Sequence, residues 1–125
     1  MQIINKFMMF QVAVSDMPKA KEFYSDKLGL KVVQDYRRDD NNWWVALTLP
    51  EGGVTITLTT NHMHMKPGTL TLYFSTSDIT ESHKELLKKD VKVNDVKDDL
   101  HGPGSGVKWF NFKDPDCNLI HIEQA

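Results

Sequence analysis

The chain repeats one pattern of strand, helix cap and hairpin, and this repeat most constrains its fold. A short strand-like run at residues 10–14 ends at Ser15-Asp16, and a similar run at residues 71–76 ends at Ser77-Asp78. The two aspartates are 62 positions apart. Both stand where a helix N-cap is expected, so the same local structure is predicted twice.

A helix is predicted after each aspartate. In the first copy Pro18 suits the first turn, and Gly29 is typical of the position just past a helix end. In the second copy Asp78 and Glu81 have the spacing of a capping box, and Asp90 occupies the stop position. The first helix therefore begins and ends at residues suited to those positions, whereas the end of the second is expected to be looser, because Asp adopts the left-handed conformation less easily than Gly.

A strand and a hairpin are predicted after each helix, and each hairpin is signalled by turn residues between β-rich runs. The expected strands are residues 30–34, 43–49 and 54–60 in the first copy, and 91–93, 107–112 and 119–123 in the second. Polar excursions are expected at residues 37–42 and 97–106. Each copy is therefore a β-α-β-β-β module.

The predicted fold class is α+β, with two βαβββ modules related by a pseudo-twofold. Module 1 spans about residues 5–60, a linker about 61–68 and module 2 about 69–124, all in one domain of 125 residues. A sheet with one helix covers only one of its faces, so the open faces of the two modules are expected to form a shared cleft. The single cysteine, Cys117, excludes an internal disulfide and a cysteine-cluster zinc site.

Strand periodicity predicts which side chains face this cleft. Counting from the aspartates and the hairpin prolines gives two equivalent pairs, Met9 with Thr71 and Thr57 with His121. Four more positions on the same faces are Gln11, Thr59, Tyr73 and Glu123. A one-residue slip would turn every one of them outward.

Composition limits the classes of partner. Fifteen Lys and Arg against 17 Asp and Glu leave a net charge of −2, without the basic surplus of a duplex-binding protein. No apolar run has the length of a membrane span, and the first residues lack the pattern of a signal peptide. We expect a cytoplasmic protein that binds neither nucleic acid nor membrane.

Several motifs resemble the vicinal oxygen chelate superfamily, which contains glyoxalase I, bleomycin-resistance proteins and extradiol dioxygenases. The opening signature is carried by Val14-Ser15-Asp16-Met17, Glu22-Phe23-Tyr24 and Lys27-Leu28-Gly29-Leu30. The closing motif is Asp114-Pro115-Asp116-Cys117-Asn118-Leu119-Ile120, in which the family usually has glycine where Cys117 stands. Trp44-Val45 and Pro50-Glu51-Gly52-Gly53 resemble small, single-domain glyoxalase-like members.

The resemblance indicates which positions would hold the ligands of a metal ion. Metal-dependent members carry His, Gln or Glu at four central positions, which here read Met9, Thr57, Thr71 and His121. One imidazole does not make a divalent-ion site, and Glu123 would join it only after a register slip of two. We therefore expect no metal and no cofactor. A metal-dependent lyase or dioxygenase with displaced ligands is the alternative.

Metal-free members, which the chain resembles more, hold an aromatic or planar compound between apolar walls and a few polar anchors. We predict a glyoxalase/bleomycin-resistance-like protein with a degenerate metal site that binds or sequesters a small, partly aromatic molecule. A strongly cationic ligand is disfavoured by the net charge of −2. The predicted ligand-binding residues are Met9, Gln11, Trp44, Thr57, Thr59, Thr71, Tyr73, Trp109, His121 and Glu123.

Other readings stay open. Trp43 and Trp44 are adjacent and must face opposite sides of a strand, and the resemblance favours Trp44 as the cleft residue. His121 could act as a general base or only as a hydrogen-bonding residue. The linker histidines His62 and His64 could bind a metal or be merely polar. The family commonly dimerises, so a homodimer is expected, and a protein-association module without a small ligand is a further alternative.

Overall fold

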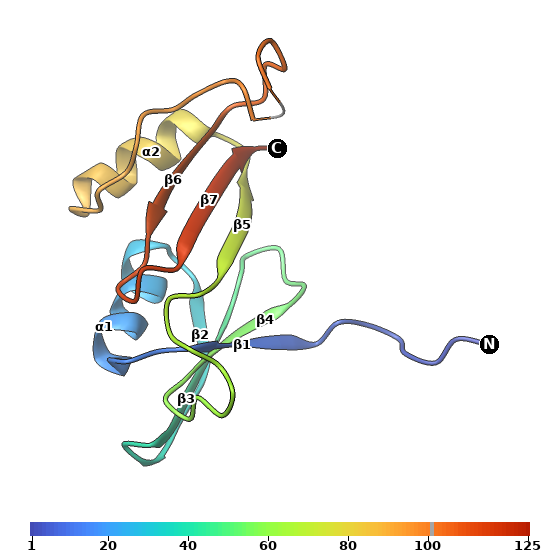
Figure 1. Cartoon of the computed structure of the whole chain (residues 1–125), viewed down its shortest axis with the longest axis vertical. Coiled ribbons are helices and arrows are strands. Elements are labelled where there is room, and N and C mark those ends of the chain that lie inside the picture. The colour runs from blue at the N-terminus through green and yellow to red at the C-terminus, as the bar shows by residue number, and fades with distance from the viewer. Residues whose placement is uncertain (101) are drawn as a thin grey trace. The chain divides into compact units, whose positions relative to one another are not determined.

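The computed structural model describes residues 1–100 and 102–125 of the chain (Figure 1). His101, which falls in the predicted polar excursion at residues 97–106, lies outside the described residues. The chain divides into two compact units, Met1–Pro67 and Gly68–Ala125. Each unit contains one sheet and one helical segment, and each is described below by itself.

The first unit is a four-stranded mixed sheet. Its strands are β1 (Met9–Ala13), β2 (Lys31–Asp39), β3 (Asn42–Thr48) and β4 (Thr55–Thr59), in the spatial order β1-β4-β3-β2. β1 runs parallel to β4, whereas β3 is antiparallel to both of its neighbours. The first and last strands of this unit are thus hydrogen-bonded to each other.

The helical segment of the first unit begins at the predicted cap. Asp16 accepts a hydrogen bond from the backbone N–H of Lys19 at 3.1 Å, and α1 (Met17–Glu22) follows with Pro18 in its first turn. The helix continues as the π-helix η1 (Phe23–Lys27), in which Leu28 donates to the carbonyl of Phe23. Gly29 then ends the segment at φ +82°, a conformation that only glycine adopts without strain.

Alternate residues of this sheet form the core on the α1 side. Val12, Leu58 and Val45 lie side by side on β1, β4 and β3, and each is completely buried. Asp35 of β2 lies beside Val45 and pairs with Lys21 of α1 at 2.5 Å, which shows that α1 covers this face. The face that carries the intervening residues is the open one.

The second unit is a three-stranded sheet with the order β5-β7-β6. Its elements are β5 (Thr71–Thr76), α2 (Ile79–Lys88), β6 (Trp109–Lys113) and β7 (Leu119–Gln124). β5 is parallel to β7, and β6 is antiparallel to β7. As predicted, Asp78 caps its helix by accepting from the N–H of Glu81, and Asp90 follows the helix end at φ +61°.

The predicted strand at residues 91–93 was wrong. That segment has no regular ladder; it is followed by a single bridge between Lys97 and Trp109. The cause lies at Asn94, whose N–H donates to the carbonyl of Asn111 while its side chain, rather than its backbone, accepts from the N–H of Asn111. A side chain in place of a carbonyl interrupts strand pairing.

The turn between β6 and β7 is held by its own side chains. The buried carboxylate of Asp114 accepts from the N–H groups of Asp116 and Asn118 and from the Asn118 amide at 2.7 Å. Asn118 in turn accepts from the N–H of Leu70, just before β5, at 2.9 Å. This network joins the β6–β7 turn to the start of the unit.

The predicted α+β fold class of two related modules is confirmed, although β2 is longer than expected. It continues to Asp39 and reverses through Asp40 and Asn41, so part of the predicted excursion at residues 37–42 is strand. Among the described residues, no helix is long and apolar enough to cross a membrane. The shared cleft between the modules stays a prediction.

Candidate ligand-binding faces

The open face of the first unit carries polar and aromatic side chains. Gln11 lies beside Thr57 across the parallel β1–β4 pair, and Trp44 lies beside Thr59 across β3–β4. Thr57 and Thr59 are buried, whereas Gln11 is exposed. The Thr59 hydroxyl is occupied by the backbone of Asn61, so Thr57 and Gln11 are the polar groups available here.

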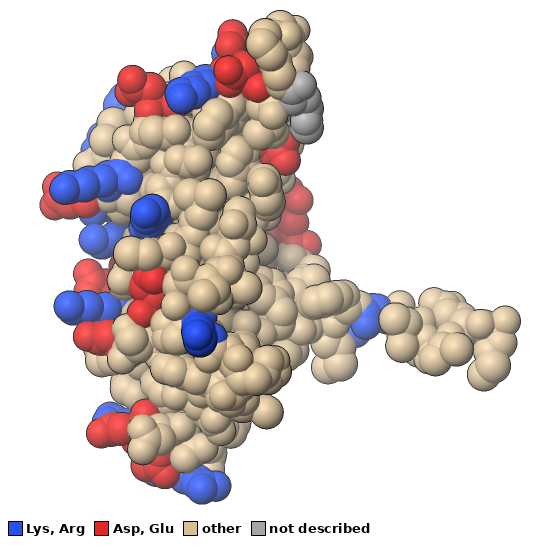
Figure 2. Space-filling view, in the orientation of Figure 1, with Lys and Arg blue, Asp and Glu red and all other residues tan. Residues whose placement is uncertain are grey.

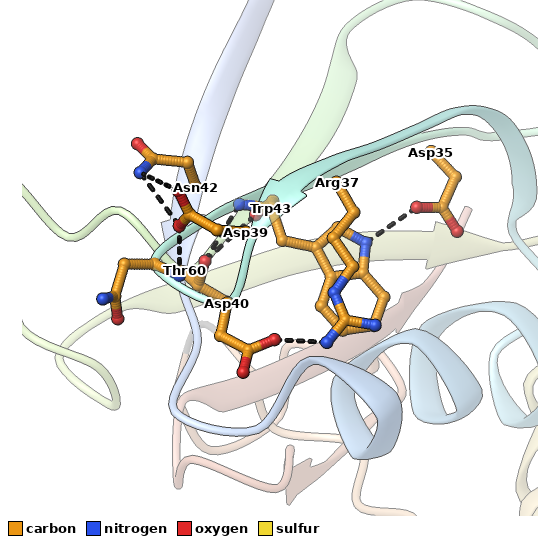
Figure 3. A network of polar contacts seen from close by, with 8 residues as sticks. Asp35, Arg37, Asp39, Asp40, Asn42, Trp43 and Thr60 are labelled. Carbon is orange, nitrogen blue, oxygen red and sulfur yellow. Dashed lines mark hydrogen bonds and ion pairs between the residues drawn. The ribbon is translucent and has the colours of Figure 1, made fainter.

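The two adjacent tryptophans face opposite sides of β3, as predicted. Trp43 lies on the α1 side, where its indole N–H donates to Asp35 at 2.7 Å and the guanidinium of Arg37 covers its ring (Figure 3). Trp44 lies on the open face and packs against Tyr36 of β2, with ring centroids 4.5 Å apart. Trp44 therefore lies on the open face of its sheet, and its place in a shared cleft stays a prediction.

The open face of the second unit carries a row of three aromatic rings. His121 of β7 lies between Trp109 of β6 and Tyr73 of β5. The imidazole stacks on Trp109 at 5.1 Å with an interplanar angle of 17°, and it lies 4.7 Å from Tyr73. The opposite face of these strands holds Phe110 and Ile120, and Phe110 contacts His83 of α2.

The imidazole of His121 is kept neutral by its surroundings. Burial lowers the pKa of His121 below its ordinary value of 6.5, because an apolar environment disfavours the charged ring. The carboxylate of Glu123, two residues along the same strand, acts in the opposite direction and raises this pKa, but by less. Nε2 of the ring is buried and has no hydrogen-bond partner among the described residues.

The predicted site residues lie on the open faces of the two sheets, and the strand register shows how they pair within each sheet; their role in binding stays a prediction. The lateral neighbours are Gln11 with Thr57 and Tyr73 with His121, and these two pairs occupy equivalent places in the repeat. Met9 and Thr71 lie one strand repeat further along, beside Thr55 and Leu119.

The sequence interpretation missed two residues of these faces. Tyr36 was not expected because β2 was predicted to end at residue 34, and Asn111 was not singled out although it lies directly across from His121. Two features of the sequence could have found them. Asp39-Asp40-Asn41-Asn42 resembles a tight hairpin turn that lengthens β2, and the alternation through Trp109 and Asn111 places both on one face.

The side chains on these faces do not fit a divalent metal ion. The repeat-related positions offer an amide, an aliphatic hydroxyl, a phenol and one imidazole, from Gln11, Thr57, Tyr73 and His121. Catalytic sites for such ions use three imidazole or carboxylate ligands, and among the described residues of its sheet face only Glu123 accompanies His121. The described residues contain no group of three His, Cys, Asp or Glu side chains that could hold a metal.

One of the two linker histidines is used within the fold. Nε2 of His62 lies 2.7 Å from the carbonyl oxygen of Val14, just after β1, so this ring is used to fix the chain after β4. His64 is exposed to solvent.

Trp109 is held in its place on the open face of the second unit, because its indole N–H donates to Asp99 at 3.0 Å and Lys97 lies over its ring.

Two repeated units, each with one helix-covered sheet face and one open face of mixed polar and aromatic character, define a class of small α+β proteins. The sequence model described as Glyoxalase/Bleomycin resistance protein/Dioxygenase superfamily matches residues 4–122. The chain belongs to this superfamily. A search of the curated proteins found no match.

Solved structures similar to this chain include two from Streptomyces sp. CB03234. One is TnmS3, an antibiotic binding protein, which is 27% identical with a TM-score of 0.85, covering 99% of this chain and 98% of TnmS3. The other is a glyoxalase/bleomycin resistance protein, 28% identical with a TM-score of 0.78, covering 95% and 100% of the two chains. A superfamily member from Sphaerobacter thermophilus DSM 20745 is 25% identical, with a TM-score of 0.81 and coverage of 99% and 100%.

Proposed function

We propose that this protein binds or sequesters a small, planar, partly aromatic molecule on the open faces of its sheets, without a metal. The observation that carries the proposal is the row of Tyr73, His121 and Trp109 on one exposed sheet face. Aromatic rings in such a row offer flat surfaces for stacking, and each stacked pair contributes about 0.5–1.5 kcal/mol beyond its buried area. The likeness to an antibiotic binding protein supports the binding of a small molecule.

The chemistry of the faces favours binding over metal-assisted catalysis. Gln11 and Thr57 supply hydrogen-bonding groups that orient a ligand, and Trp44 with Tyr36 supplies a second aromatic surface. The ligand-binding set is then Gln11, Trp44, Thr57, Tyr73, Trp109 and His121, with Met9, Thr59, Thr71 and Glu123 at its margins. The protein works in the cytoplasm and needs no cofactor in this proposal.

The three tryptophans allow a direct test. In a protein that carries Trp43→Phe, the two remaining indoles, Trp44 and Trp109, both lie on open sheet faces and report on them. A panel of planar aromatic compounds is screened by thermal shift, and each hit is titrated against this fluorescence. We expect saturable quenching. Affinity should fall roughly tenfold in Trp44→Ala but not in Trp43→Phe, since of these two adjacent residues Trp44 is on the open face and Trp43 on the helix-covered face.

Metal titration separates this proposal from the enzyme alternative. Purified protein is analysed for metals and then titrated with nickel, zinc and manganese. Weak or undetectable binding agrees with the donor set on the faces, because one imidazole and one carboxylate hold such ions poorly. Tight binding of one ion per chain contradicts the proposal, as does a panel of compounds in which no member binds.

We also propose that the protein is a homodimer in which the N-terminal arm, residues 1–8, packs on a second copy. Large apolar side chains of this arm are exposed, among them Met1, Ile3, Ile4, Phe7 and Met8. Figure 2 shows the extended arm almost free of acidic and basic groups. The arm leads into β1, an edge strand with one free side, and exposed apolar surface of this kind is typical of an interface.

Light scattering after size exclusion tests the dimer. The full chain is expected at the mass of two chains, and a variant that lacks residues 1–6 at the mass of one, because the deletion removes most of the exposed apolar arm. The double change Ile3→Ser and Ile4→Ser is a milder second variant, which removes two apolar side chains and leaves the backbone of the arm in place. A full chain that runs as one copy at high concentration contradicts the proposal.

A further inference from the structure

Nε2 of His121, which has no hydrogen-bond partner among the described residues, is a feature of the binding face that the proposed function does not use. The residue is only 5% exposed, and its Nε2 is buried without a partner among the described residues. Buried polar groups in folded proteins nearly always have a hydrogen-bond partner, because an unpaired one loses its bonds to water without replacement. A buried nitrogen of this kind, at the centre of a row of rings, therefore indicates a missing partner.

The two aromatic rings beside the His121 imidazole differ in how firmly they are held. Trp109 is fixed by its hydrogen bond to Asp99 and by the backbone bridge between residues 97 and 109. Tyr73, on the other side of the imidazole, is 67% exposed. Exposed side chains change rotamer within nanoseconds, so Tyr73 can move from the imidazole while Trp109 keeps its place. A ligand that takes the place of the Tyr73 ring then lies against the imidazole of His121.

We infer that the ligand of this face is a planar aromatic compound that carries a hydroxyl group at its ring edge, and that this hydroxyl hydrogen-bonds to Nε2 of His121. The inference rests on the proposed function and adds the chemical group that decides specificity. The ring takes the place of the Tyr73 ring against the imidazole, and the hydroxyl supplies the partner that Nε2 lacks.

A hydroxyl fits this nitrogen better than the other common polar groups. A neutral imidazole offers Nε2 either as a donor or as an acceptor, depending on its tautomer, and a hydroxyl can pair with both. A carboxylate pairs best with the charged ring, which burial disfavours, and it would also lie near the carboxylate of Glu123. A hydroxyl carries no charge and avoids both costs.

The test is a cycle in which the protein and the probe are each changed at one group. The probes are 2-naphthol and 2-methylnaphthalene, which have the same ring and a substituent of nearly the same size, with and without a hydroxyl. Their affinities are measured by calorimetry for the unchanged protein, for His121→Phe and for the control His64→Phe, which changes an exposed histidine outside the face. The preference for 2-naphthol is the ratio of the two affinities in each protein.

We expect this preference to fall about fivefold in His121→Phe and to stay unchanged in His64→Phe, since one hydrogen bond of ordinary net strength corresponds to such a ratio. In His121→Gln, whose amide can donate and accept, part of the preference should return. Nitrogen-15 spectra of the imidazole rings give a second measurement, in which 2-naphthol shifts the Nε2 resonance of His121 and 2-methylnaphthalene leaves it nearly unchanged.

The outcomes separate this inference from the proposed function. If both probes bind and His121→Phe keeps the same preference as the unchanged protein, the hydroxyl inference is overturned while the binding function stands. If neither probe binds up to its solubility limit, the proposed function fails and the inference with it. If His121→Phe does not fold, His121→Gln and the Nε2 resonance decide, and an unmoved resonance with bound 2-naphthol overturns the inference.

Discussion

Replacing Asn118 with alanine should weaken the second unit by more than any exposed asparagine would. The side chain donates to the carboxylate of Asp114 at 2.7 Å and accepts from the N–H of Leu70 at 2.9 Å, and Asn118 is only 1% exposed. A hydrogen bond to a charged group is worth about 1.5–3 kcal/mol and one to a neutral group about 0.5–1.5 kcal/mol. Their loss gives an expected decrease of about 2–4 kcal/mol in the free energy of unfolding.

Urea unfolding measures this loss. The fluorescence of Trp109, in the background that carries Trp43→Phe and Trp44→Phe, follows the second unit, and far-ultraviolet circular dichroism follows the whole chain. The midpoint should fall while the slope of free energy against urea stays constant, because the exposed surface on unfolding is nearly unchanged.

The matched control for Asn118→Ala is Asn61→Ala. Asn61 is exposed, and its amide donates to Asn42 at 3.3 Å, so its removal should cost less than about 0.5 kcal/mol. If Asn118→Ala costs no more than Asn61→Ala, the two buried hydrogen bonds contribute no net stability and the reasoning about the β6–β7 turn is refuted.

The remaining predictions concern backbone conformation and protonation. Gly68→Ala should destabilise the second unit by at least about 2 kcal/mol in urea unfolding, because its φ is +81° and a Cβ there would lie 2.1 Å from the carbonyl oxygen of Asp116. Cys117→Gly should instead stabilise the unit by about 0.5–1 kcal/mol, since Cys117 has φ +72°, a backbone conformation that glycine adopts without strain. An unchanged urea midpoint would contradict this. As pH falls below 6.5, the unfolded chain protonates His121 before the folded chain does, so the free energy of unfolding should fall, and His121→Gln should flatten that part of a stability–pH curve. The pKa of Asp35 is lowered chiefly by Lys21, so its stabilising effect is present above pH 3.8 and is lost as the pH falls through the folded pKa; Asp35→Asn should therefore differ from the unchanged protein at neutral pH and match it in acid.

The parts of the fold that the sequence predicted correctly are those fixed by local chemistry. Asp16 and Asp78 cap helices because their side chains reach the N–H three residues on, and that spacing is visible in the chain. The hairpin turn at residues 114–118 was predictable for the same reason, since Asp114 and Asn118 bond within the turn itself. Each of these features depends on residues close together in sequence.

The parts that were missed depend on contacts between distant residues. The segment after α2 has strand-like composition, yet the side chain of Asn94 bonds to the backbone of Asn111, 17 positions away, and prevents a regular ladder. The π-helix at residues 23–27 was missed for a different reason: its hydrogen bonds are local, but apolar spacing does not distinguish it from a continuation of the α-helix.

The candidate faces were predictable as faces but not in detail. Strand alternation places Thr57, Tyr73 and His121 on open faces, and the pairing of strands agrees with this. The stacking of His121 on Trp109 and its unpaired Nε2 could not be predicted, because they depend on register between β6 and β7 and on side-chain rotamers. The lowered pKa of His121 follows from that burial.

The pairing of the first strand with the last in each unit determines when its sheet can form during synthesis on the ribosome. β1 must wait for β4, so the first sheet becomes complete only once Thr59 has emerged, and β5 must wait for β7 in the same way. Until then β1 and β5 lack the partners that they have in the two sheets and expose backbone groups that can pair wrongly. The newly made chain therefore passes through two separate intervals in which an unpaired strand can pair incorrectly, one for each copy of the repeat.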